Sequence, residues 1–316
     1  MKILSLLGAL LIASTAVAQT ETAPAPAPAL VKFKARPFVV GDKAAVSSKV
    51  KVTMNVSVTV GGMEQGAQSQ SQDETNQHGL EVLGVDKNGV VNKAKVTTTK
   101  WDKLEKTEAP MQAPSETGLS AGQTALVGKT VIIDASQSPA AVTDEEGKAV
   151  DDETAKAARK QYLQDDGTFK AFSDRIAKTV PAEMRIGETI KLDGAQVAAL
   201  VGADGEDADL GDPKDVFSGT LTLKEVRNVL GNEVGVFDLV TKMTGGQELP
   251  FTISGDPKGE ILIGVNDKYL YKMAVKGQIK VEGGQTIDAG DEQIEIAFTG
   301  GGDVDVNGGA IYSKKK

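Results

Sequence analysis

The sequence predicts a mainly β protein of the α+β class, with antiparallel, curved sheets or β-meanders in two halves and an amphipathic helical segment between them. Apolar and polar residues alternate through Val46–Val60, which is the period of a strand with one buried and one wet face. Glycine and pairs such as Asn-Gly separate the extended segments on both sides of the middle. The middle itself, Asp151–Pro181, has helical spacing.

Residues 1–18 have the pattern of a secretory signal peptide. Lys2 is followed by the apolar run Ile3–Ala13 and by the small-residue motif AVA, which favours cleavage. The run is too short to cross a bilayer core of ~30 Å as a helix, and the chain has no cysteine that could be acylated. Residues 19–30, rich in Ala and Pro, predict an extended spacer before one β-rich body of residues 31–316. We therefore expect an exported protein, soluble in the periplasm or outside the cell, without a lipid anchor or a transmembrane segment in its mature part.

Strands dominate the first half of the body, residues 31–150. The expected strands are Val46–Val60, Leu80–Val85, Val90–Trp101 and Ala125–Asp134. Asn88-Gly89 predicts a tight hairpin turn. The polar run Glu64–Gln77 is open to two interpretations, a hairpin tip or the start of the partner strand. Lys103–Ser120 is polar and contains proline, which predicts a loop or an edge.

Helices 151–180 are expected to join this half to the second. Phe169, Phe172, Ile176 and Val180 recur at intervals of three and four, which places them on one face of a helix. Gly167 predicts a break between two helices, and Pro181 predicts the end of the second. The aromatic face is typical of core packing. The alternative is that Phe169, Phe172 and Ile176 face a ligand.

The second half, residues 182–316, again has the pattern of a β-meander. Asp193 is placed to cap a short helix through Val201. The expected strands are Met184–Leu192, Phe217–Val229, Glu233–Met243, Leu249–Ser254, Glu260–Val265, Lys268–Lys276 and Gln293–Thr299.

Composition excludes several classes of function. The net charge of −9 is unfavourable for binding nucleic acid or an anionic membrane surface. With no cysteine and a single histidine, zinc sites and His-dependent catalytic triads are nearly excluded. That histidine, His78, lies in a polar run and is predicted to be solvated. We expect no cofactor.

Candidate site residues are few. Asp303, Asp305 and Asn307 match the opening of a calcium loop, but Lys314 stands where its bidentate Glu belongs, and a terminal strand explains the same spacing. Trp101, the only tryptophan, either lines a ligand cleft or fills a core edge. Acids of the 204–212 loop, namely Asp204, Glu206, Asp207 and Asp209, could supply the carboxylate pair of a glycoside hydrolase.

The order of elements resembles an uncharacterised group of exported bacterial β-rich proteins. The segments that carry the resemblance are VLGVDKNGVV, RIGETIKL, DGAQVAALVG and GTLTLKEVRNVLGNEVGVFDL. The resemblance implies the architecture and export from a bacterial cell, and it transfers no catalytic residue. By fold-level analogy, envelope carriers of lipid-like molecules also wrap curved antiparallel sheets around helices.

Together these observations favour a non-enzymatic binding or structural protein of the bacterial cell envelope. We expect it to hold an apolar small molecule or an envelope component between the curved sheet and the helix. The alternative is a carboxylate-dependent hydrolase, assisted by calcium.

Overall fold

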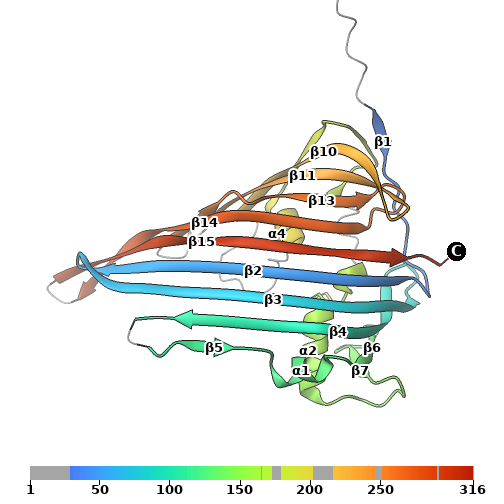
Figure 1. The fold of residues 1–316 in the computed structure, drawn as a ribbon, viewed down its shortest axis with the longest axis horizontal. Coiled ribbons are helices and arrows are strands. Elements are labelled where there is room, and N and C mark those ends of the chain that lie inside the picture. The colour runs from blue at the N-terminus through green and yellow to red at the C-terminus, as the bar shows by residue number, and fades with distance from the viewer. Residues whose placement is uncertain are drawn as a thin grey trace, which may run out of the picture.

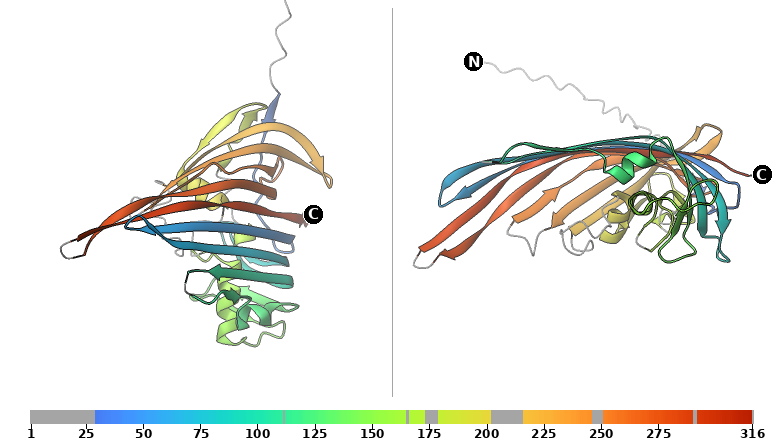
Figure 2. Two further views of the ribbon diagram at one scale, coloured as in Figure 1. Left: turned by 60° about the vertical axis from the view of Figure 1, so that its left-hand side comes forward. Right: turned by 90° about the horizontal axis from the view of Figure 1, so that it is seen from below.

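A computed structural model describes residues 29–110, 112–164, 166–172, 179–201, 216–245, 251–289 and 292–315. The protein is built on one large antiparallel sheet that arches over its helices (Figures 1 and 2). The expected mainly β, antiparallel fold is therefore confirmed. The expected signal peptide and the first part of the spacer lie outside the described residues.

The sheet has thirteen strands among the described residues, in the order β7-β6-β4-β3-β2-β15-β14-β12-β11-β10-β9, with β13 between β11 and β14 and β5 beside β4. The strands of the first half are β2 (Lys43–Val60), β3 (Met63–Val85), β4 (Val91–Glu108), β5 (Ser115–Thr117), β6 (Thr130–Asp134) and β7 (Ala141–Thr143). Those of the second half are β9 (Thr189–Leu192), β10 (Phe217–Val229), β11 (Asn232–Gly245), β12 (Phe251–Gly255), β13 (Lys258–Gly264), β14 (Leu270–Ala289) and β15 (Glu292–Ser313). A separate pair joins β1 (Leu30–Lys32) to β8 (Glu183–Arg185).

The two halves share the sheet because the first long strand pairs with the last. β2 runs antiparallel to β15, and the paired residues extend from Lys43 opposite Ser313 to Val60 opposite Ile296. The polar run Glu64–Gln77 is the start of the partner strand of β2, the second of its two interpretations, since β3 begins at Met63. Lys103–Ser120 was expected to be a loop or an edge, and its first six residues are not a loop, since β4 continues to Glu108, while β5 within the same segment pairs only with β4 and is an edge strand. The first six residues form a strand because residues of β3 pair with every β4 residue from Asp102 to Glu108.

The helices cover one end of the inner face of the sheet (Figure 2). They are α1 (Ala121–Leu126), α2 (Asp152–Tyr162) and α4 (Gly194–Val201), with a short 3-10 turn η1 (Lys170–Phe172). Asp151 caps α2 by accepting a hydrogen bond from the Thr154 amide at 2.9 Å. Asp193 accepts one from the Gln196 amide at 2.8 Å, which confirms the expected cap of α4.

The second expected helix is not found where the sequence placed its start. Phe169 forms an isolated β-bridge with Leu163, after a turn in which Gly167 has φ 79°. Hydrogen bonds from the Thr168 amide and hydroxyl to the Asp166 carboxylate stabilise this turn locally. Ile176 lies outside the described residues.

Two cores lie on the inner face. Core 1 joins α4 to β9–β11, β13 and β14, and its largest fully buried residues are Phe237, Met184, Leu221, Leu223, Leu239, Ile261 and Ile263. Core 2 joins α1 and α2 to β3, β4 and β6, and includes Phe169, Leu126, Ile133, Trp101, Val82, Val96, Ala158 and Tyr162. Each half of the chain therefore has its own core on a shared sheet.

Candidate functional site

One row of facing residues shows that both cores belong to the same face. Residues directly opposite each other in antiparallel strands point to the same side of a sheet. The row crosses from core 1 to core 2 through Phe237, Ile261, Met273, Gly308, Ser48, Asn76 and Trp101. The inner face is thus continuous from one core to the other.

Beyond this row the sheet extends past the helices, in the long strands β2, β3, β14 and β15 (Figure 2). The described helices make their main contacts with β4, β7 and β10. The inner face of the extension carries a set of apolar residues that we call the apolar floor. It consists of Val50, Val52, Met54, Val56, Val58 and Val60 on β2, Ile296, Phe298, Val304 and Val306 on β15, and Ile279 and Val281 on β14.

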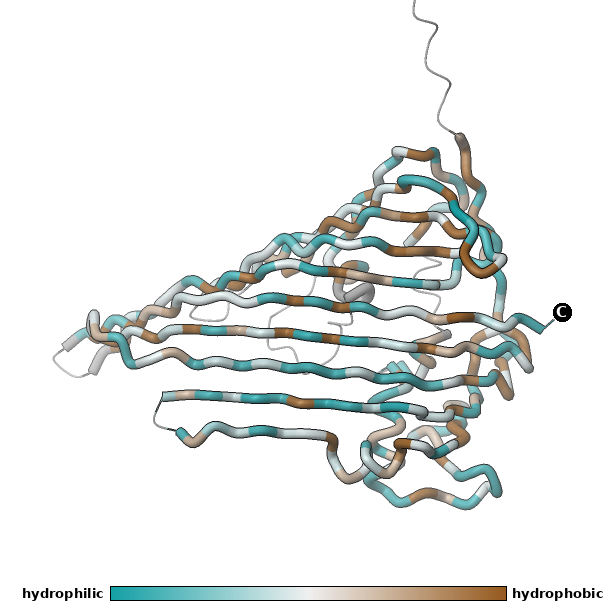
Figure 3. Tube along the Cα trace, in the orientation of Figure 1, coloured by the Kyte–Doolittle hydropathy of each residue, from teal (hydrophilic) through white to brown (hydrophobic). Residues whose placement is uncertain are grey.

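The apolar floor is half-buried where β2 and β15 form it. Figure 3 shows hydrophobic positions recurring along β2, β14 and β15, next to a mostly hydrophilic β3. From Val50 to Val60 the floor is about 34 Å long at the usual rise of a strand. That is about the ~30 Å thickness of a bilayer hydrocarbon core, which holds two layers of acyl chains.

Glycines shape the floor. Gly300 and Gly302 stand on the inner face of β15, and a Cβ there would overlap the main-chain oxygens of Asn55 and Thr53. Only glycine lets β2 and β15 approach in this way. Glycine in a strand interior marks close approach or bending of a sheet, so these positions support the curvature of the floor.

A polar border follows the floor on β3 and β4. The β3 positions opposite Met54, Val52 and Val50 are Gln70, Gln72 and Glu74. Glu74 accepts hydrogen bonds from Trp101 Nε1 at 2.9 Å and from Gln72 Nε2 at 3.3 Å. The inner face is therefore amphipathic across the strands.

Between this border and core 2 lies His78, whose predicted exposure was wrong. His78 is half-buried, and its ring contacts Tyr162 of α2 edge-on at a centroid distance of 4.9 Å. Burial lowers the pKa of His78 to about 4, so the ring is neutral at pH 7. The polar sequence around it did not reveal that α2 packs against this part of β3.

Asn76 is the neighbour of His78 on the same face. Its Oδ1 lies 2.6 Å from His78 Nδ1, and in the Nδ1-protonated tautomer of the neutral ring this contact is a hydrogen bond to the amide oxygen. Asn76 is 1% exposed, and its Nδ2 has no hydrogen-bond partner among the described residues. A buried donor without a partner is costly and uncommon in folded proteins.

The aromatic residues expected to face a ligand belong to core 2 where the structure describes their side chains. Phe169 is 1% exposed and Trp101 is 3% exposed, and both pack in that core. The backbone of Phe172 is in η1. Trp101 also marks the end of the polar border through its hydrogen bond to Glu74. Phe169 lies too deep to line a surface.

The calcium motif is part of a strand. Asp303, Asp305 and Asn307 alternate along β15 on the outer face, opposite Thr53, Lys51 and Lys49. Asp305 forms an ion pair with Lys276 at 2.7 Å. An extended strand does not wrap its carboxylates around one ion, so the strand interpretation accounts for these residues. No cluster of three or more metal-ligating side chains occurs within the described ranges.

The acids proposed for a hydrolase, Asp204, Glu206, Asp207 and Asp209, lie outside the described residues, so that alternative stays a prediction.

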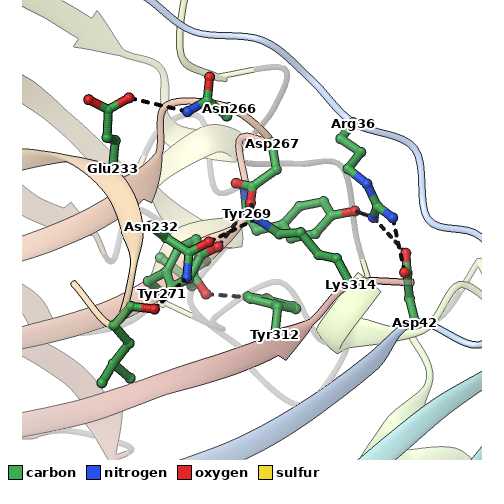
Figure 4. A network of polar contacts seen from close by, with 12 residues as sticks. Arg36, Asp42, Asn232, Glu233, Asn266, Asp267, Tyr269, Tyr271, Tyr312 and Lys314 are labelled. Atoms are coloured by element: carbon green, nitrogen blue, oxygen red, sulfur yellow. Dashed lines mark hydrogen bonds and ion pairs between the residues drawn. The ribbon is translucent and has the colours of Figure 1, made fainter. Parts of the chain in front are cut away.

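A polar network that the sequence did not predict ties both ends of the body to the sheet (Figure 4). Arg36 donates to both carboxylate oxygens of Asp42, at 2.6 and 3.0 Å, and to the Tyr269 hydroxyl at 2.9 Å. Tyr271 donates to Asp267 at 2.9 Å, and Lys314 forms an ion pair with the same carboxylate. Asp42 and Asp267 are each 2% exposed.

Aromatic contacts complete this network. Phe38 stacks on Tyr269 with centroids 4.2 Å apart, and Tyr312 lies 4.7 Å from Tyr269. Burial raises the pKa of Tyr269 to about 12 and raises that of Tyr312 further. These hydroxyls are poor acids at pH 7, and the network joins residues 36–42, the 267–271 turn and the C-terminal strand. It has the properties of a structural element.

A groove of about 530 Å³ lies on the outer face, beside the β10–β11 turn. Leu230 and Ile311 supply apolar walls, while Lys49, Lys272 and Gln77 add polar ones. Leu230 is 72% exposed, so the groove is open on that side. Most of the surface that lines this groove is apolar.

Comparisons with known proteins identify no family. No family model matches the chain, and no curated protein matches it. Among solved structures, one from work on lipid–protein interactions in lipovitellin is similar with a TM-score of 0.35 and 10% identity, over 88% of this chain and 26% of the lipovitellin chain. The chain thus spans about a quarter of that protein's length, and a likeness this weak carries no functional argument. Within the described residues, no helix is long and apolar enough to cross a membrane.

Proposed function

We propose that the chain is an exported, non-enzymatic binding protein of the bacterial cell envelope that holds an apolar or lipid-like molecule on the apolar floor. The observation that carries the proposal is the alignment of twelve apolar side chains on β2, β14 and β15, on the inner side of a curved sheet. The β2 and β15 members of this set are half-buried, and an apolar surface that the protein covers only in part is typical of binding surfaces. Export rests on the signal-peptide pattern of residues 1–18 and on the resemblance to exported bacterial proteins.

The proposed ligand position differs from the one expected from the sequence. The sequence placed the ligand against the Phe169 face of a helix, but that side chain is buried in core 2. The apolar floor lies farther along the same face, where the described helices make few contacts. Hydrophobic association scales with the apolar area removed from water, so this surface gains most from a ligand.

The first test is binding of the uncharged fluorophore N-phenyl-1-naphthylamine, which fluoresces in apolar surroundings. We expect saturable binding by the wild type, and at least tenfold weaker binding by Val56→Asp, because a carboxylate in the floor must be desolvated by the probe. The matched control is Asn55→Asp, one residue away on the exposed outer face. Val58→Thr adds a hydroxyl at nearly constant shape, and should weaken binding less than Val56→Asp.

Far-UV circular dichroism must show that each variant is folded. Equal affinity of Val56→Asp and the wild type would refute the floor as the site. A second test is native mass spectrometry of protein purified from its exported fraction. An added mass of several hundred daltons that is lost on denaturation would support a bound lipid-like molecule.

A further inference from the structure

We propose that the ligand of the apolar floor is an amphipathic lipid with an uncharged, hydroxyl-bearing headgroup, and that Asn76 and His78 bind that headgroup. This inference rests on the proposed function and names the chemical class of its ligand. Three features of the inner face carry it: the order of polar and apolar strands, the charge balance, and the unpartnered amide of Asn76.

The order of strands predicts how an amphipathic molecule lies. The apolar floor is on β14, β15 and β2, and the hydrophilic border is on the next strand, β3. Asn76 and His78 stand on β3 at the inner end of this border, opposite Ser48 and Val46 of β2. A chain on the floor can therefore place its polar end beside Asn76 while its apolar part stays on β2 and β15.

The charge balance argues against an anionic headgroup. Among the described inner-face positions on and beside the floor, the charged side chains are Glu74, Lys103 and Glu105. Lys103 and Glu105 form an ion pair at 2.8 Å, which leaves the carboxylate of Glu74. A phosphate or carboxylate headgroup would meet no free cation there, and the net charge of −9 adds to the repulsion. The neighbouring Gln70 and Gln72 are neutral donors and acceptors, which suit hydroxyl groups.

Asn76 and His78 supply one donor and one acceptor side by side. Asn76 Nδ2 is a donor without a partner among the described residues. In the tautomer that donates from Nδ1 to Asn76 Oδ1, His78 Nε2 is an acceptor. A hydroxyl group both accepts and donates, and can satisfy this pair, whereas a carboxylate or phosphate ester offers only acceptors. A hydroxyl-bearing headgroup would thus satisfy a buried donor that the fold leaves unpaired.

The test displaces N-phenyl-1-naphthylamine from the full chain with three ligands of one chain length, below their micelle concentrations. The ligands are monolauroylglycerol, laurate and dodecyl phosphate, compared at pH 8. We expect monolauroylglycerol to displace the probe at a concentration at least tenfold lower than either anion. Equal or better displacement by an anion would overturn the proposed headgroup.

Asn76→Leu tests the anchor. Leu keeps the branched shape of Asn and removes the unpaired donor, but it is larger and also removes the acceptor of His78 Nδ1, so far-UV circular dichroism must show that the variant is folded. We expect the probe to bind this variant unchanged and the tenfold preference for monolauroylglycerol to fall to about twofold. The control, Asn55→Leu, lies on the outer face and should keep the preference.

Persistence of the preference in Asn76→Leu would overturn the role of this residue. The outcomes also separate this inference from the proposed function. If the probe does not bind the wild type, the floor itself is refuted. If the probe binds and the anions compete best, only the headgroup and its anchor are refuted.

Discussion

The buried pair Arg36–Asp42 allows the sharpest test of how the body is held together. Arg36→Met keeps the apolar part of the side chain but removes its four hydrogen bonds, two to Asp42, one to Tyr269 and one to the Lys315 carbonyl oxygen. Asp42 is 2% exposed, so the variant leaves a carboxylate that water does not reach. Removing one partner of a buried pair costs about 3–5 kcal/mol.

Two features of the site place the expected loss at the lower end, about 3 kcal/mol. Asp42 keeps hydrogen bonds from the Val39 and Lys315 amides, at 3.0 and 2.8 Å. The Arg36 side chain is itself 25% exposed, so its charge is partly screened in the wild type. The matched control is Arg227→Met, which removes an exposed arginine paired with Glu225 and should cost less than about 1 kcal/mol.

The assay is urea unfolding followed by Trp101 fluorescence, since this buried residue is the only tryptophan. The dependence on pH gives a second, independent readout. In the wild type, burial raises the pKa of Asp42, but hydrogen bonds from Arg36 and the two amides outweigh it and the pKa is lowered. Asp42 therefore stabilises the fold above its unfolded pKa of about 3.9, and this contribution is lost as the pH falls through the lower folded value.

Without Arg36 we expect the effect of burial to prevail and the pKa of Asp42 to rise. Protonation of Asp42 then removes the buried charge and stabilises the variant. We expect the difference in unfolding free energy between the wild type and Arg36→Met to shrink as the pH falls from 7 to 4. A loss no larger than that of Arg227→Met, or a difference independent of pH, would refute the reasoning.

Two further predictions concern His78 and the glycines of the floor. Because His78 is the only histidine, its NMR titration is unambiguous, and its pKa should be about 4 in the folded protein, against about 6.5 when unfolded. The unfolded chain then binds the proton more readily, so the unfolding free energy should fall by about 3 kcal/mol as the pH falls from 6.5 to 4. His78→Phe should remove this part of the dependence of stability on pH. A folded pKa near 6.5 would contradict the burial of the ring. Gly302→Ala should lower the stability by about 1–3 kcal/mol in urea unfolding, because its Cβ overlaps the Thr53 carbonyl oxygen. The control is Gly308→Ala on the same strand, where the added Cβ would lie 3.6 Å from its nearest neighbour, the Ser47 carbonyl oxygen. Equal losses of stability in the two variants would contradict the close approach of β2 and β15 at Gly302.

Patterns along the chain predicted the fold well where one face of a strand is apolar. The alternation of Val46–Val60 is β2, and Asn88-Gly89 lies in the turn between β3 and β4, with Gly89 at φ 79°. Asp193 predicted the start of α4 because a cap is a local interaction. Strand ends were less predictable. Residues 63–77 and 103–108 are polar, and only their pairing within the sheet makes them strands.

The site depends on contacts between segments far apart in the sequence, which alternation cannot reveal. His78 becomes half-buried because Tyr162 packs on it from α2, and Asp42 becomes buried because residues 36 and 315 converge on it. The helical spacing of Phe169 had two explanations, and its burial in core 2 agrees with core packing, although the residue lies in a β-bridge next to a turn and not in a helix. One signal in the sequence could have located the floor. Every second residue of β15 from 300 to 308 is glycine or valine, namely Gly300, Gly302, Val304, Val306 and Gly308. This is the pattern of a bending strand with an apolar inner face.

The position of the apolar floor has a physical consequence for how the protein could bind and release a ligand. A ligand enclosed between α2 and the sheet would need core 2 to open, because Phe169 and Tyr162 fill that space with exposures of 1% and 2%. Opening a packed core approaches the cost of unfolding it. A ligand on β2 and β15 would leave both cores closed, whereas the Asn76 donor, 1% exposed and opposite Trp101, would become accessible only if the side chains around it move. An amphipathic binding face beside closed cores therefore suits reversible carriage better than permanent storage, and the unpaired Asn76 donor at its inner end would give that carriage its selectivity.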